Sequence, residues 1–153
     1  MMHNMKITEA LLAEHNIFLS VFDQIERVLP SLTTQAEVRT MANIIEGLLE
    51  GHARTETNLA YLALDHVLAD NGELARMHQD HHEIDDRLGK VQTAKTCAEA
   101  RRLLRVAITS TREHFRGEER SVFPLLEKAL QEETLAELGQ TWLQRQAAQA
   151  IQA

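Results

Sequence analysis

Histidines and acids recur four residues apart in this chain, a spacing that brings two side chains onto one face of a helix. His52 precedes Glu56 in "HARTE", and His114 precedes Glu118 in "HFRGE". Both pairs fall on the apolar face of a 3.6-residue pattern, and His15 falls on a third such face. Burying an unpaired carboxylate costs several kcal/mol, and these faces hold no Lys or Arg to neutralise it. We therefore predict that a metal cation neutralises these buried carboxylates. A polar core held only by hydrogen bonds is the alternative.

A second histidine cluster lies in "ARMHQDHHEIDDRL", residues 75–88, which holds His78, His81 and His82. The wheel places His81 near the middle of the apolar face, His78 toward its edge and His82 well off it. We therefore predict His81 as the inward ligand, His78 as a candidate second ligand and His82 in solvent. Asp85 shares the face of His81 and could hold a ligand histidine by a hydrogen bond. The apolar residues that define this face are Leu74, Met77, Ile84, Leu88 and Val91.

The other histidines and acids are expected to lie outside the site. His3 is terminal, and His66 is separated from His52 by about 21 Å of helical rise. Glu119 follows Glu118 directly, so the wheel turns it away from the centre of the core-facing sector.

Four long helices would position these residues. Apolar periodicity predicts helices at about 8–29, 35–67, 71–91 and 97–129, and a further helix from Thr134 that carries the only tryptophan. Thr8 can cap the first, and capping boxes at "TQAE", "DNGE" and "TCAE" precede the next three. Pro124 should kink the fourth, because it lacks an N–H and crowds the carbonyl of Arg120. Short connections imply antiparallel neighbours. We predict an all-α, up-down four-helix bundle over about 8–130 and an additional C-terminal helix over about 134–150, within one domain of residues 1–153.

Composition narrows the function classes. The 153 residues include two prolines and six glycines, and 44% are hydrophobic, as expected for a helical globular chain. A formal charge of -7 without a basic stripe argues against nucleic acid as a partner. No apolar run approaches the roughly 20 residues of a membrane span, and the N-terminus lacks the apolar centre of a signal peptide. The single cysteine, Cys97, excludes an internal disulfide framework. We expect a cytoplasmic location.

The ordered motifs resemble those of the hemerythrin and hemerythrin-like, HHE cation-binding domain family. The resemblance covers roughly residues 8–130 and is carried by "EH" at Glu14–His15, "HARTE", "MHQDHHEIDDRL" and "HFRGEERSVFP". It implies two iron ions in the bundle centre, bridged by two carboxylates and an oxygen; zinc or manganese would accept many of the same ligands. Helix three carries His-x-x-x-His at His78 and His82, so which of these supplies a second ligand beside His81 stays open.

The resemblance also implies roles for individual residues. Glu56 and Glu118 would bridge the irons, His15 and His52 would hold one, and His81, His114 and His78 would hold the other. One iron would keep an open position for dioxygen, peroxide or nitric oxide. The family resemblance supports a non-heme diiron protein that binds or reduces such an oxidant. A non-catalytic module that stores or senses iron or oxygen, and a structural bundle with a vestigial polar core, are the alternatives. The redox partner and a homo-oligomeric state are left open.

Overall fold

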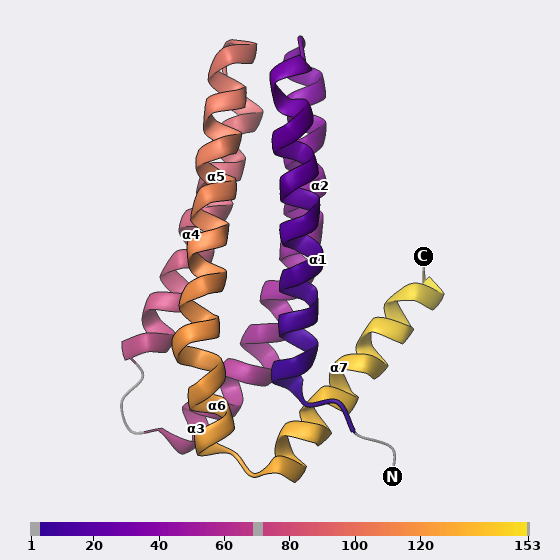
Figure 1. Cartoon of the computed structure of the whole chain (residues 1–153), viewed down its shortest axis with the longest axis vertical. Coiled ribbons are helices and arrows are strands. Elements are labelled where there is room, and N and C mark those ends of the chain that lie inside the picture. The colour runs from indigo at the N-terminus through magenta and orange to yellow at the C-terminus, as the bar shows by residue number, and fades with distance from the viewer. Residues whose placement is uncertain (1–3, 69–71, 153) are drawn as a thin grey trace.

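The computed structural model describes residues 4–68 and 72–152, and within these ranges the chain is helical with no strand. Short loops join the helices into an up-down arrangement, with the four long helices side by side (Figure 1). The predicted all-α bundle with an additional C-terminal helix is confirmed. The elements are α1 (Ile7–Val28), α2 (Gln35–Thr55), α3 (Leu62–Val67), α4 (Gly72–Thr93), α5 (Cys97–Gly117), α6 (Phe123–Ala129) and α7 (Glu132–Gln152).

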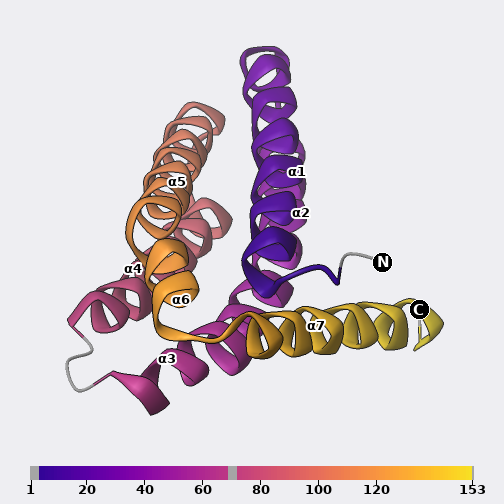
Figure 2. The ribbon, with the colours of Figure 1, turned by 60° about the horizontal axis from the view of Figure 1, so that its bottom comes forward.

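Helix packing follows the antiparallel order. α4 lies along α5 and α2, while α1 contacts α2 and α5. The C-terminal helix α7 packs against α1 and runs at a steep angle to the long helices, as Figure 2 shows. Among the described residues, no helix has the length and apolarity that crossing a membrane requires.

Two of the predicted helix caps are present. The Thr34 hydroxyl accepts a hydrogen bond from the Glu37 backbone N–H at 3.2 Å, and the Glu37 carboxylate accepts one from the Thr34 N–H at 2.9 Å. Thr96 caps α5 in the same way, by accepting from the Glu99 N–H at 3.1 Å. These contacts satisfy backbone donors that the first turn of a helix leaves free. The predicted cap at Asp70 lies outside the described residues.

The predicted cap at Thr8 is wrong. α1 begins at Ile7, and the preceding residue, Lys6, donates its backbone N–H to the Glu9 carboxylate at 2.8 Å. Thr8 lies inside the first turn, where it is buried and donates its hydroxyl to Glu127. Thr8 therefore makes a hydrogen bond with a residue distant in sequence instead of capping its own helix.

The second and fourth predicted helices are not continuous α-helices. A π-helical segment, η2 (Glu56–Tyr61), separates α2 from α3, and another, η3 (Glu118–Val122), separates α5 from α6. η3 ends just before Phe123 and Pro124, so the irregularity expected from proline is a stretch of π-helix that precedes it. Both π segments begin at the carboxylates singled out by the sequence. Such segments widen the turn by one residue and are frequent at functional sites.

The apolar core is divided in two along the bundle axis. In α1, Phe18 belongs to the larger cluster and Leu11 to the smaller one, with His15 between them. In the second helix, Leu49 and Leu59 flank the site in the same way. The polar residues therefore form a layer with apolar packing on both sides.

Candidate metal centre

Six of the seven predicted site residues meet in this polar layer. Glu56 and Glu118 are completely buried, as is His15, and the side chain of His81 is the most accessible of the six at 15% exposed. They come from four different helices, so only the folded bundle assembles them. The six are His15, His52, Glu56, His81, His114 and Glu118.

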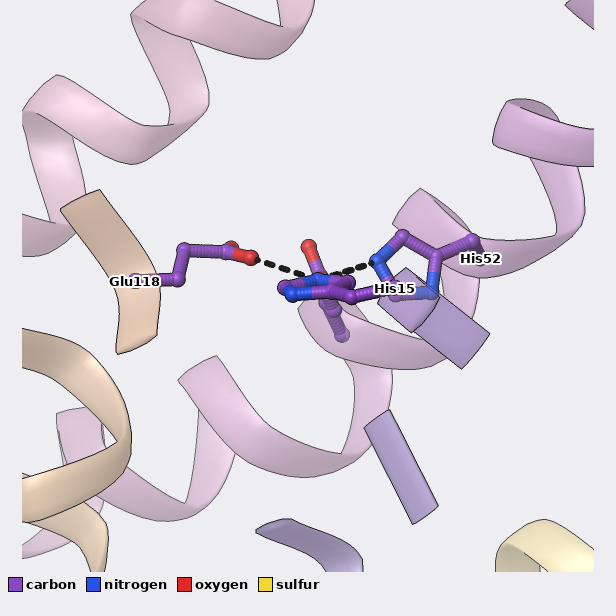
Figure 3. Close-up of side chains that lie close together, drawn as sticks. His15, His52 and Glu118 are labelled. Carbon is purple, nitrogen blue, oxygen red and sulfur yellow. Dashed lines mark hydrogen bonds and ion pairs between the residues drawn. The ribbon is translucent and has the colours of Figure 1, made fainter. Parts of the chain in front are cut away.

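The first half of the site is formed by His15 and His52 with one oxygen from each carboxylate. Nε2 of His15 lies 3.0 Å from Nε2 of His52 and 3.2 Å from Oε2 of Glu118. Nε2 of His52 lies 2.5 Å from Oε1 of Glu56. Figure 3 shows His15 between His52 and Glu118, with its ring nitrogen directed at both. These four ligand atoms lie within 4.8 Å of one another.

The second half repeats the arrangement with the other two carboxylate oxygens. Nε2 of His81 lies 2.9 Å from Nε2 of His114 and 3.1 Å from Oε2 of Glu56. Nε2 of His114 lies 3.2 Å from Oε1 of Glu118. Each carboxylate therefore presents one oxygen to each histidine pair, which is the arrangement that two bridged cations require.

Carboxylates behind the site hold the outer nitrogens of three imidazoles. Such contacts fix the ring orientation and leave Nε2 free to bind a metal. Sequence reasoning missed all three acids, because each lies on a different helix from its histidine, and Glu119 was in addition expected to point away. The pairs are His52 Nδ1 with Glu14 at 2.8 Å, His15 Nδ1 with Glu119 at 2.9 Å and His114 Nδ1 with Asp80 at 3.2 Å.

The structure differs from the sequence predictions for two acids, Glu119 and Asp85. Glu119 does not simply point outward: it contacts His15, because η3 turns the residues after Glu118 relative to a regular α-helix. Asp85 is exposed, and within the described residues it makes no ion pair with a histidine. His81 is thus the one imidazole of the four without a carboxylate on Nδ1 in the part of the chain described.

The remaining histidines lie elsewhere. His78 belongs to neither ligand group; its ring meets the edge of Tyr61 with centroids 5.2 Å apart. His82 is exposed, as predicted, and His66 is exposed in α3. His3 lies outside the described residues.

Tyr61 is a further residue of the site that sequence reasoning missed. It is 1% exposed, and its hydroxyl donates to Oε1 of Glu118 and approaches Oε2 of Glu56 at 3.2 Å. An α-helix would direct Ala60, not Tyr61, along the face of Glu56. The only feature of the sequence that could have indicated this role is that the single tyrosine of the chain lies five residues after Glu56.

The electrostatics of the cluster favour charged imidazoles in the absence of a cation. Burial alone would lower the pKa of His52, but the charge of Glu56 and hydrogen bonds with Glu14 and Glu56 outweigh burial and raise the pKa to about 10. Burial likewise opposes charge on His114, yet its hydrogen bonds with Glu118 and Glu56 raise that pKa to about 10. Glu56 keeps a pKa well below its usual value despite burial, because His52 and the neighbouring imidazoles stabilise the anion. A metal would have to displace protons from these rings.

The donor set fits a divalent or trivalent first-row metal. Each half offers two imidazole nitrogens and two carboxylate oxygens, a mixture that iron, zinc and manganese all accept. Oε2 of Glu118 is buried and, among the described residues, has no aligned hydrogen-bond donor, although Nε2 of His15 is 3.2 Å away. A cation between these two atoms would satisfy both of them.

A small cavity adjoins the site. It measures about 20 Å³ and borders His52, His81 and His114, with Thr111 and Phe115 on its far wall. That volume holds about one water-sized molecule. The site therefore has room beside it for a small ligand of two or three atoms.

These features define an all-α bundle with a buried, carboxylate-linked pair of histidine sites able to bind metal. The family described as hemerythrin HHE cation-binding domain matches residues 6–126, and the chain belongs to this family. Comparison with curated proteins and with solved structures found no match.

Proposed function

We propose that this chain is a non-heme diiron protein whose bundle centre binds or reduces a small oxidant. His15 and His52 would hold one iron, His81 and His114 the other, and Glu56 and Glu118 would bridge them. The observation that carries the proposal is the sorting of carboxylate oxygens: Oε1 of Glu56 faces the first histidine pair and Oε2 the second. A polar core held by hydrogen bonds alone would not need both carboxylates divided in this way.

The bound irons would supply redox equivalents and an open coordination position for dioxygen, peroxide or nitric oxide. The cavity beside His52, His81 and His114 supports a ligand of this size. Apolar clusters pack against the polar layer on both sides and limit its contact with solvent. Glu14, Asp80 and Glu119 orient three of the imidazoles. Glu14 also raises the pKa of His52 through its hydrogen bond and so stabilises positive charge on that ring when no metal is present.

Reconstitution of the full chain tests the proposal. Metal-free protein is loaded anaerobically with ferrous iron, desalted and exposed to air, then examined by elemental analysis and optical spectroscopy. We expect about two irons per chain, as two ligand groups imply, and the near-ultraviolet charge-transfer absorption of a coupled ferric pair. A stoichiometry of one, or retention of zinc without iron, would overturn the diiron proposal.

The same preparation separates an oxidant-consuming enzyme from a binding module. Catalytic consumption of peroxide or nitric oxide by the loaded protein would favour an enzyme. An optical spectrum that bleaches and recovers reversibly as oxygen is removed and returned would favour a carrier or sensor. Protein that retains no metal in either experiment would be a structural bundle.

A further inference from the structure

Tyr61 is buried in the second half of the site although no ligand role was expected for it. It is the last residue of η2, where the π-helical turn carries residue i+5 to the side of the helix that Glu56 occupies. Its ring stacks on His81, with centroids 5.8 Å apart and planes 19° apart. The ring edge meets His78. Tyr61 thus stands between His78 and the ligand cluster, in the place where the sequence predicted a further histidine.

The Tyr61 oxygen faces only the carboxylate oxygens of the second half. It approaches Oε2 of Glu56 and Oε1 of Glu118, the two oxygens that also contact His81 and His114. Within the described residues the hydroxyl makes no hydrogen bond with the carboxylate oxygens directed at His15 and His52. The hydroxyl therefore belongs to one metal position and not to both.

A phenol has one proton to donate, whereas two carboxylate oxygens converge on this hydroxyl. One proton cannot satisfy both acceptors fully, and Tyr61 is buried. A cation bounded by Glu56, Glu118 and the phenol oxygen would satisfy all three oxygens at once. Ferric iron accepts a tyrosine oxygen as a ligand in other proteins, and a bound cation favours the deprotonated form of its ligands.

We propose that Tyr61 is a metal ligand of the second half of the site, together with His81, His114, Glu56 and Glu118. The inference rests on the proposed diiron function. Binding releases the phenol proton to solvent and forms an iron–oxygen bond without any change of oxidation state. The two irons would then differ: one would be held by two imidazoles and two carboxylate oxygens, and the other would have a phenolate in addition.

The single tyrosine of the chain makes the test specific, because any iron–phenolate signal must come from Tyr61. The full chain is loaded with iron, oxidised in air and examined by visible absorption and by resonance Raman spectroscopy excited in that absorption. We expect a visible charge-transfer band with tyrosinate ring modes. In Tyr61→Phe, which keeps the ring against His81, band and modes should disappear, and iron in the second half should be released at least ten-fold faster to a chelator.

His78→Gln provides the matched control, because His78 touches the Tyr61 ring from outside both ligand groups. This variant should keep the phenolate band. A wild-type protein with two irons and no tyrosinate modes would overturn the role of Tyr61 and leave the diiron proposal standing. A wild-type protein that retains no iron would overturn both. Circular dichroism of Tyr61→Phe checks that the bundle still forms.

Discussion

The two halves of the site share their carboxylates but differ in their surroundings. In the first half, which we call the closed half, His15 stacks on Phe115 at 3.9 Å between centroids, and Phe18 meets the edge of the His52 ring. Both imidazoles are buried and both have a carboxylate on Nδ1. α7 adds to this enclosure, because Gln146 donates a hydrogen bond to Glu14 at 3.4 Å.

The second half, which we call the open half, is less constrained. His81 is 15% exposed and, in the described part of the chain, has no acid on its outer nitrogen. It borders both the small cavity beside His52 and His114 and an exposed hollow of about 430 Å³ between α2 and α4. His78, His82 and Asp85 line that outer hollow. The difference indicates that the closed half would hold a metal more rigidly, whereas a small ligand would enter beside His81.

Loss of a shared carboxylate should have the largest effect, because it removes a ligand from both halves. In Glu118→Ala we expect both irons to be lost, since each half loses one of four donors and the buried imidazoles lose a counter-charge. Elemental analysis after anaerobic loading measures the loss. Glu46→Ala, an exposed position on α2, is the control and should retain about two irons. Retention of one iron in Glu118→Ala would show that the two halves do not share this carboxylate.

Loss of one histidine should distinguish the halves. In His81→Ala we expect about one iron per chain, retained in the closed half, because the ligands around His15 and His52 are unchanged. Loss of a direct ligand should weaken the binding of the second iron by more than the roughly 10- to 100-fold that is typical when a residue contacting a ligand is lost. Titration with ferrous iron gives both affinities. Two irons bound with wild-type affinity would exclude His81 as a ligand.

The outer carboxylates should have a smaller effect, confined to one half. Glu14→Gln keeps the size of the side chain but replaces a charged acceptor for the His52 Nδ1–H by a neutral amide. We expect about 10- to 100-fold weaker binding of one iron, with the other unchanged. Asp85→Asn is the matched control in the open half, because Asp85 is exposed and makes no ion pair with a histidine in the described chain. Equal losses in the two variants would contradict the distinction between the halves.

Much of this arrangement was predictable, because it depends on regular helical periodicity. The apolar faces of the helices predicted the bundle, and the same wheel directed His15, His52, His81 and His114 inward. The wheel failed where the helix changes type. The π segments begin at Glu56 and at Glu118, so the residues that follow them, including Tyr61 and Glu119, face other directions than the wheel predicted.

The outer acids could not have been predicted for a different reason. Glu14 adjoins His15 in sequence yet holds His52 of the neighbouring helix, and Asp80 adjoins His81 yet holds His114. These pairings depend on the relative rotation of packed helices, which periodicity within one helix does not determine. The sequence could therefore predict which residues face the centre, but not which acid supports which histidine.

Without metal, the two halves should respond alike to pH. His52 in the closed half and His114 in the open half both have a pKa raised to about 10, against about 6.5 in the unfolded chain. Their contribution to stability is complete below pH 6.5 and is lost as the pH rises toward and through 10, because unfolding then releases protons. We expect the unfolding free energy of the metal-free protein, measured by denaturant titration, to fall across this window. His52→Gln and His114→Gln should each reduce the slope; a slope unchanged in both would exclude charged imidazoles.

Substitution of the two α4 histidines that lie outside both ligand groups, His78 and His82, should have the smallest effects on iron binding and stability. His82→Ala should change the unfolding free energy by no more than about 0.5 kcal/mol and leave iron binding unchanged, because the side chain is exposed and outside both ligand groups. His78→Ala removes a ring contact with Tyr61 but no ligand atom, so it should loosen the open half only slightly and leave two irons bound. Iron titrations of these two variants and of His81→Ala measure how much each histidine contributes to iron binding. If His82→Ala lost iron while His81→Ala kept it, α4 would have to be rotated relative to the bundle in the loaded protein. His78 and His82, four residues apart, would then supply the α4 ligands of the open half.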